Sequence, residues 1–226
     1  NAASPGVINV FMPNKFYQND DEYLEKLSNI MSAEYKTITK NNLHLQLDCP
    51  DLALARHMNY KDLSDEDFLQ RAEKQIEALN HALSGIPSDQ VRMHICWGNY
   101  EGPHIHDISL SKIMPIVLKA NVETILIESS NPRHSHEWQV FEDIKLPNDK
   151  MIAPGVIDST TNFVEHPEVI KNRLIKFSKV INKDQIIAGT DCGFSTFAGF
   201  GNVDESIVYK KLEAFVRGSE LASKVI

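Results

Sequence analysis

Short apolar runs alternate along the chain with longer amphipathic stretches. Six of these runs are rich in apolar or β-branched residues and are bounded by Pro, Gly, Asn or Asp, which is typical of strands. They are Val7–Met12, Leu43–Asp48, Val91–Trp97, Glu123–Glu128, Met151–Asp158 and Gln185–Asp191. Several are almost continuously apolar, as expected for parallel strands that are covered by helices.

Between the predicted strands, apolar residues recur at the spacing of amphipathic helices. One stripe consists of Leu24, Leu27, Met31 and Ile38, and a second helix is predicted to begin at Ser64 and end before Gly85. Three more helices are expected within Ser109–Ala120, Pro167–Asn182 and Asp204–Ser223. The interval between the fourth and fifth strands is predicted to be mainly loop, with at most a short helix.

Strict alternation of strands and helices predicts an α/β fold with a parallel sheet and right-handed crossovers. Two architectures satisfy it: an open doubly wound sheet, and a (β/α)8 TIM barrel from which two βα units are missing. The glycine-rich phosphate-binding motifs of doubly wound nucleotide binders are absent from the sequence. We therefore favour the barrel, as a single domain over residues 1–226, and expect a longer natural chain to supply the missing units.

Composition narrows the classes of function. With 42% hydrophobic and 24% charged residues the chain has an ordinary soluble composition. The net charge of −8 argues against a nucleic-acid partner, and no apolar run approaches the ~20 residues that span a bilayer. The first residues lack the features of a signal peptide. Three cysteines are too few for a disulfide scaffold, so thiols in a reducing cytoplasm are expected.

Metal-ligating side chains occur at the ends of several predicted strands. His94 and Cys96 lie two residues apart and would point to the same side of the third strand. Glu128 ends the fourth strand, and Cys192 follows the sixth. Functional residues of (β/α) barrels gather at such carboxyl ends, and these four side chains are enough for a tetrahedral zinc site. Each also has a structural interpretation, as a buried His or Cys or a capping carboxylate.

The charge of this ligand set bears on its chemistry. Two thiolates and one carboxylate give Zn²⁺ a net charge of −1, which makes the ion a poor activator of water. A thiol bound to it would still lose its proton and remain nucleophilic. The set therefore favours alkylation of a thiol over hydrolysis.

These residues resemble the zinc site of the cobalamin-independent methionine synthase family, whose catalytic domain is a barrel. The matching motifs are His94-x-Cys96, Glu128, Asp191-Cys192-Gly193, Leu45-Gln-Leu-Asp48-x-Pro50 and Pro154-Gly-Val-Ile-Asp158. Residues 96–104, 131–134, 155–167 and 188–194 are similar to the epoxyalkane:coenzyme M transferase-like branch of that family. The likeness extends over essentially the whole chain.

The resemblance implies that zinc is the cofactor and that His94, Cys96, Glu128 and Cys192 hold it. It implies that Asp48 binds the amino group of a thiol such as homocysteine. It also implies that the barrel's first two βα units are the missing ones. The expected function is transfer of a methyl or other alkyl group to a thiol, with homocysteine as the first choice of acceptor and another thiol as the alternative. A homo-oligomer is possible.

Two positions depart from the methionine synthase pattern. The family places a proton-donating His two residues after the Asp of its P-G-V-x-D motif, where this chain has Thr160. Asp158 and His166 are our candidate catalytic residues, and His104 is a second candidate proton donor. The aromatic residue that stacks on folate is also replaced, by the segment 12–15. The sequence therefore leaves the donor open between a folate and a corrinoid protein.

Other assignments remain open. Trp97, Asn99 and His134, with His136 and Trp138, are candidates to line the substrate pocket, or else they pack within loops. The motif His104-Ile-His106-Asp107 suggests a barrel metallohydrolase with a dinuclear His/Asp site. A non-enzymatic protein, with a structural zinc or as an inactive zinc-binding scaffold, is the other alternative. Structural zinc sites tend to have paired C-x-x-C motifs, which the chain lacks.

The ligand assignment predicts the metal content of cysteine variants. The intact protein should bind about one zinc ion per chain, and Cys96→Ser or Cys192→Ser should lose metal and activity together. Cys49→Ser, the matched control, should lose neither, because Cys49 lies outside the ligand set. Metal analysis of the purified variants measures this, and full zinc retention in both ligand variants would refute the site.

Overall fold

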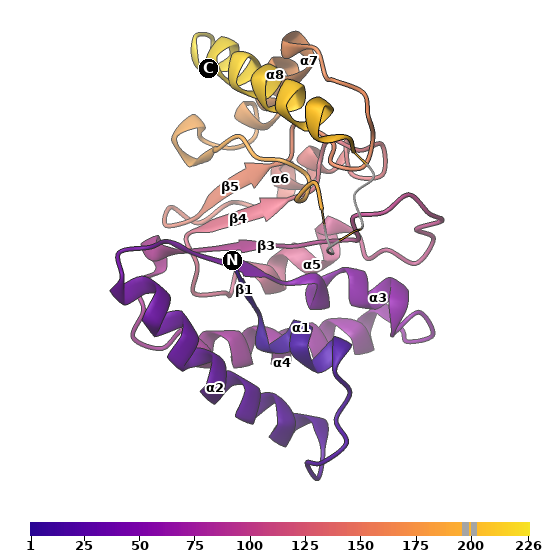
Figure 1. Cartoon of the computed structure of the whole chain (residues 1–226), viewed down its shortest axis with the longest axis vertical. Helices are drawn as coiled ribbons and strands as arrows, with labels where there is room; N and C mark the ends of the chain where they lie inside the picture. Colours follow the sequence, from indigo (N-terminus) through magenta and orange to yellow (C-terminus); the bar gives the residue numbers. More distant parts are fainter. Residues whose placement is uncertain (196–198, 200–202) are drawn as a thin grey trace. The chain divides into compact units, whose positions relative to one another are not determined.

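The computed structural model describes residues 1–195, 199 and 203–226 and divides the chain into two compact units. The first unit contains residues 1–98 and 103–125, and the second contains residues 99–102 and 126–226. Figure 1 shows the chain coloured along its sequence. That the whole chain forms a single domain stays a prediction.

The strands are parallel and follow one another in chain order. In the first unit β1 (Ala2–Ala3) pairs with β2 (Leu45–Asp48), and β2 pairs with β3 (Val91–His94). The strand order of the sheet is β1-β2-β3-β4-β5, with β4 at Thr124–Ile127 and β5 at Met151–Pro154. The predicted parallel α/β architecture is confirmed.

Three helices described in the first unit begin after a capping side chain, that of Ser4, Asn19 or Ser64. The helices of this unit are α1 (Pro5–Phe11), α2 (Asp20–Lys40), α3 (Leu54–Met58), α4 (Asp65–Ala82) and α5 (Leu110–Val117), with short 3-10 turns at Pro50–Leu52 and Ser88–Gln90. The Ser64 side chain accepts a hydrogen bond from the N–H of Asp67, and the first turn of α4 is acidic, which suits the positive end of the helix dipole. The predicted start at Ser64 is confirmed.

The first predicted strand, Val7–Met12, is wrong, because this segment is the helix α1. Ser4 accepts a hydrogen bond from the N–H of Val7 (2.9 Å), and Pro5 occupies the first helical position. Both features favour the start of a helix. The buried Val7 and Val10 lie three residues apart, a spacing that fits a helix face, so the apolar run alone did not decide between strand and helix.

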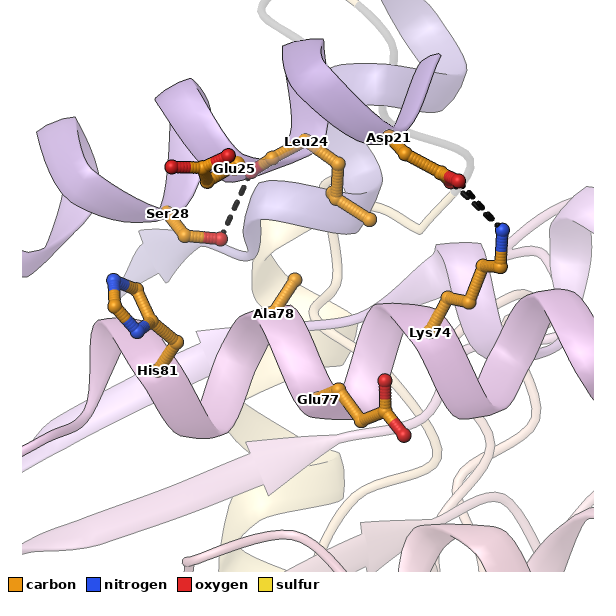
Figure 2. A pocket seen from close by; sticks show the side chains of 8 residues that line it. All are labelled: Asp21, Leu24, Glu25, Ser28, Lys74, Glu77, Ala78 and His81. Atoms are coloured by element: carbon orange, nitrogen blue, oxygen red, sulfur yellow. Dashed lines mark hydrogen bonds and ion pairs between the residues drawn. The ribbon is translucent and has the colours of Figure 1, made fainter. Parts of the chain in front are cut away.

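The long helices α2 and α4 pack against each other through apolar residues. Figure 2 shows the groove between them, in which Leu24 faces Ala78. Lys74 donates a hydrogen bond to Asp21 across this groove (2.8 Å), but both side chains are more than half exposed. Exposed ion pairs contribute about 0–1 kcal/mol, so burial of the apolar stripe holds the two helices together.

The second unit contains α6 (Val140–Asp143), α7 (Pro167–Ser178) and α8 (Glu205–Ser223), with 3-10 turns at Glu137–Gln139 and Lys183–Gln185. In Figure 1, α7 and α8 lie side by side. Gly218 permits this packing, since a Cβ there would lie 2.5 Å from the Cβ of Ile170.

The interval after β4 has only short helical turns, as predicted. The sixth predicted strand is reduced to isolated pairings at Ile186 and Gly189. No helix within the described ranges is long and apolar enough to cross a membrane.

A carboxylate lies buried in the first unit beside the start of α1. Asp51 is 2% exposed, and its Oδ1 accepts a hydrogen bond from the Ser4 hydroxyl (2.7 Å). Burial raises its pKa to about 7, although the Ser4 hydrogen bond opposes the shift. Gly6 makes room for it, because a Cβ there would lie 2.1 Å from Asp51 Oδ2.

The raised pKa of Asp51 predicts a pH-dependent stability. An unfolded Asp releases its proton near pH 4, whereas folded Asp51 keeps it until about pH 7. The folded state thus binds more protons between these values, so the free energy of unfolding falls as the pH rises from about 4 to about 7. Asp51→Asn should flatten this slope in urea unfolding at several pH values, and exposed Asp62→Asn should not. Equal slopes in wild type and Asp51→Asn would contradict the assignment.

Candidate metal centre

Two metal-ligating side chains of the first unit lie together after β3. His94 is the last residue of the strand and Cys96 follows two residues later, and their ligand atoms are within 4.8 Å of each other. Backbone hydrogen bonds fix both positions. The His94 carbonyl accepts from the N–H of Cys49 (3.0 Å), and the Cys96 carbonyl accepts from the N–H of Leu54 (2.9 Å). His94 is buried and Cys96 partly exposed, so the pair is held by the fold and still accessible.

Asp48 lies beside this pair, because β2 and β3 pair in parallel with Asp48 opposite His94. Asp48 is exposed as a whole residue at the end of β2. Neighbouring atoms partly enclose its carboxyl group, and this partial burial raises the pKa of the carboxyl. The charge of His94 opposes that rise and the charge of Cys96 adds to it. The predicted amine-binding carboxylate thus lies next to two predicted zinc ligands.

The other two predicted ligands form a pair within the second unit. The Cys192 thiol donates a hydrogen bond to Glu128 Oε1, with Sγ and Oε1 3.6 Å apart, and both residues are buried. Ligands that share a zinc ion at its usual bond lengths lie about 3.3–3.8 Å apart. The separation of these two atoms fits a shared zinc ion.

The second oxygen of Glu128 is already engaged. Oε2 accepts hydrogen bonds from Asn131 Nδ2 (2.9 Å) and Arg133 Nη2 (3.1 Å). Oε1 is the oxygen that faces the thiol. The carboxylate is therefore oriented to offer a single oxygen to a metal, with its remaining charge balanced by Arg133.

Asp191 connects the segments that carry Glu128 and Cys192. Its carboxylate accepts hydrogen bonds from the N–H groups of Ser129, Ser130 and Asn131 and from Asn131 Nδ2, at 2.8–3.0 Å. Burial raises its pKa, and these hydrogen bonds oppose the rise. Since Asp191 precedes Cys192 and its partners follow Glu128, it sets the relative position of the two ligands.

Asn131, Arg133 and Asp191 lie in motifs that resemble the family, but the sequence alone gives none of them a role. The sequence shows that Asp191 directly precedes Cys192. The N–H groups that donate to Asp191 lie about sixty residues earlier in the chain. Arg173 adds to the same support: it donates to the Ser130 carbonyl (3.0 Å) and to the Val156 carbonyl (2.8 Å). Backbone donors carry no residue identity, so the sequence offers no pattern that reveals this network.

Asn99, a predicted substrate-binding residue, also supports the second pair. Its Nδ2 donates to the carbonyl of Gly193 (2.7 Å), and its Oδ1 accepts from the Ser159 hydroxyl (2.8 Å). Gly193 directly follows Cys192, and Ser159 directly follows Asp158. Asn99 thus links the loop that carries a candidate ligand to the loop that carries a candidate catalytic residue.

His134 lies buried beside Arg133 in the second unit. Its Nδ1 is 2.8 Å from Glu137 Oε2, and its Nε2 is 3.4 Å from Arg133 Nη1. A guanidinium only donates, so Nε2 faces it as an acceptor and the imidazole proton belongs on Nδ1. His134 therefore orients the guanidinium that also contacts Glu128.

The remaining predicted residues have other surroundings. The Trp97 ring is fully buried, and its indole N–H donates to the Ile108 carbonyl (2.7 Å), as in the loop-packing alternative. Cys49 is buried as well, and burial raises the pKa of its thiol well above the usual value. Cys49 is therefore poorly suited to act as a thiolate.

Asp158 and His166 belong to the loop after β5. Burial opposes the ionised form of Asp158, but hydrogen bonds from Thr160 and Thr161 and the charge of Lys211 outweigh it, and its pKa lies below the usual value. Exposed His166 caps α7, with its Nδ1 accepting the N–H of Glu168 (3.2 Å), so the ring proton belongs on Nε2. Lys211 and Glu165 form a buried ion pair (2.9 Å), and Glu165 accepts the N–H of Asp158 (2.7 Å), which fixes this loop.

Comparison with known proteins places the chain in a family. The family described as "Cobalamin-independent synthase, Catalytic domain" matches residues 14–205. The 2-hydroxypropyl-CoM lyase of Xanthobacter autotrophicus is 25% identical over 171 residues, which are 65% of this chain and 44% of that protein. The 5-methyltetrahydropteroyltriglutamate–homocysteine methyltransferase of Actinobacillus pleuropneumoniae is 30% identical over 154 residues, 67% of this chain and 18% of that protein.

A solved B12-independent methionine synthase from Shewanella sp. W3-18-1, in complex with selenomethionine, has a similar fold. The TM-score is 0.70 at 20% sequence identity, and the match covers 93% of this chain and 57% of that chain. The likeness confirms the predicted (β/α)-barrel type of fold. The chain spans less than half the length of the two curated relatives. It belongs to the cobalamin-independent synthase family, within the catalytic domain.

Proposed function

We propose that this protein transfers a methyl or other alkyl group to a thiol, with one zinc ion held by His94, Cys96, Glu128 and Cys192. The observation that supports this best is the buried Glu128–Cys192 pair, whose 3.6 Å separation suits a shared metal. The His94–Cys96 pair after β3 offers one nitrogen and one sulfur in addition. Membership of the synthase family supports the same chemistry.

The donor set favours thiol chemistry. When bound, zinc would lower the pKa of the acceptor thiol and leave its sulfur nucleophilic. Two thiolates and the Glu128 carboxylate supply three negative charges, which disfavour activation of water. The proposed acceptor is homocysteine, with coenzyme M as the alternative that the Xanthobacter relative suggests.

Glu128 is the ligand that we expect to give way to the acceptor thiol. A carboxylate is the hardest donor of the four, and zinc is borderline-soft. The hydrogen bonds from Asn131 and Arg133 would retain Oε2 of the released carboxylate, so its charge stays compensated in a buried position.

Other residues would bind the acceptor and handle protons. Asp48, beside His94, is placed to bind an ammonium group of the acceptor. The lowered pKa of Asp158 suits an orienting carboxylate better than a proton donor. His166, which is exposed, is the proposed donor to the leaving group; it would give a proton as the imidazolium and return to the neutral ring, so its Nδ1 would have to release the N–H of Glu168 when the ring is protonated. The alkyl donor, a folate or a corrinoid protein, stays open.

Thiol binding supplies the test of this proposal. Saturating homocysteine should raise the number of sulfur neighbours of zinc from two to three and release about one proton per site. Zinc-edge X-ray absorption and calorimetry in buffers of different ionisation enthalpy measure the two quantities. Glu128→Gln should retain some zinc but change the affinity for the thiol, while exposed Glu142→Gln should match wild type. An unchanged zinc shell with both homocysteine and coenzyme M would refute the mechanism.

The positioning role of Asp191 yields a separate prediction. In Asp191→Asn an amide N–H₂ group would replace one oxygen that accepts from Asn131, so that donors face each other and Asn131 loses its place beside Glu128. Loss of such a supporting partner typically weakens metal binding about 10- to 100-fold. Competition with a chelator measures zinc affinity, and exposed Asp184→Asn is the control. Wild-type affinity in Asp191→Asn would rule out the positioning role.

A further inference from the structure

A cavity of about 170 Å³ lies among three helices of the first unit. Side chains of α1, α2 and α4 line it, all within residues 9–75 and outside the proposed zinc ligands. Asp21, Leu24 and Lys74, which Figure 2 shows in the neighbouring groove, also line this cavity. Pockets for drug-sized ligands have volumes of ~300–1,000 Å³, so this one suits a molecule of a few non-hydrogen atoms.

Gln75 brings a hydrogen-bond acceptor to this cavity from α4. The residue is only 5% exposed, and among the described residues its buried Oε1 has no hydrogen-bond partner. Buried carbonyl oxygens are nearly always hydrogen-bonded, because the loss of water without a replacement costs free energy. The missing donor is therefore expected on a molecule that occupies the cavity.

Arg71, one helical turn before Gln75, brings a hydrogen-bond donor. Tyr60 holds its guanidinium in place: Cζ lies 4.4 Å from the centre of the Tyr60 ring, and Nη2 donates to the Tyr60 hydroxyl (2.7 Å). Its Nε is buried and has no hydrogen-bond partner in the part of the chain that the structure describes. The occupant of the cavity is therefore expected to accept a hydrogen bond as well as to donate one.

The charges around the cavity have both signs. Asp20 and Asp67 line it from the first turns of α2 and α4, and Arg71 and Lys74 supply positive charge. A molecule with an ammonium group and a carboxylate matches this arrangement. Its ammonium group is a charged donor for Gln75 Oε1, and its carboxylate is a charged acceptor for Arg71 Nε.

We propose that this cavity binds a small zwitterionic α-amino acid, held by Gln75 Oε1 and Arg71 Nε. Leu24 offers an apolar contact to an aliphatic side chain of the ligand. Because the buried Asn9 lines the same cavity, the bound amino acid would join α1 to α2 and α4. The site is separate from the acceptor site of the proposed function, and neither proposal depends on the other.

Titration of the ¹⁵N-labelled protein with L-valine, which has no thiol to bind zinc, tests this site. In ¹H–¹⁵N correlation spectra we expect saturable shifts of the backbone amides of α4 around Gln75. Isobutylamine lacks the carboxylate of valine, and isovalerate lacks its ammonium group. Each analogue should bind about 10- to 100-fold more weakly, because it loses a hydrogen bond that involves a charged group. Gln75→Leu should weaken L-valine binding by a similar factor, whereas Gln18→Leu, at an exposed glutamine of the same unit, should bind as wild type does.

The outcome is independent of the proposed function. Asp48→Asn should leave the L-valine shifts of α4 in place, since that variant alters only the proposed acceptor site. Three results would each overturn the proposal and leave water as the occupant: no saturation with L-valine, equal affinity for either analogue, or unchanged binding in Gln75→Leu. Circular dichroism establishes that the variant is folded, and the comparison of the three ligands needs only the wild-type protein.

Discussion

A carboxylate that is removed from water must find hydrogen-bond donors within the protein, and Asp191 finds them in the backbone after β4. This requirement fixes the second unit around the candidate centre. The three N–H groups hold the turn after Glu128, and the covalent bond to Cys192 carries the constraint to the thiol. Gly155 permits the approach, since a Cβ there would lie 2.0 Å from Asp191 Oδ1. Glu128 and Cys192 lie close together because the buried Asp191 carboxylate needs the backbone donors that follow Glu128.

In the first unit, strand pairing positions the other two proposed ligands. Parallel register places Asp48 beside His94, and the chain beyond β3 brings Cys96 within reach of the same imidazole. Each unit thus prepares half of the proposed ligand set on its own. The fold already holds these side chains in place, so they lose little conformational entropy when a metal binds. The free energy of metal binding is therefore more favourable.

The sequence predicted most of the framework, since helix starts and parallel strands depend on local chemistry. Ser64 caps α4 where the sequence predicted its start, and Asp204 caps the helix that was expected within Asp204–Ser223. Val7–Met12 was misassigned because an apolar run fits both a buried strand and a helix face, and the capping Ser4 and Pro5 decided the outcome. Capping residues therefore predict where a helix begins, whereas an apolar run alone does not distinguish a strand from a helix.

The candidate site was predictable only in part, for a related reason. The four proposed ligands were visible as residue types at strand ends. The support from Asp191, Asn131 and Arg133 was not visible, because it depends on backbone donors and on contacts between distant segments. Trp97 shows the opposite case: its type suggested a substrate contact, whereas its indole N–H serves a loop carbonyl. Such roles follow from tertiary packing, which a single sequence does not encode locally.

The central claim, that one ion joins both pairs, is tested most directly by a two-dimensional ¹H–¹¹³Cd correlation spectrum of the cadmium-substituted protein. Scalar couplings through the metal–ligand bonds identify each ligand by its own protons. A single cadmium resonance should couple to the β-protons of both Cys96 and Cys192 and to ring protons of His94. A resonance coupled to only one of the two cysteines, or two separate resonances each coupled to one, would contradict the claim.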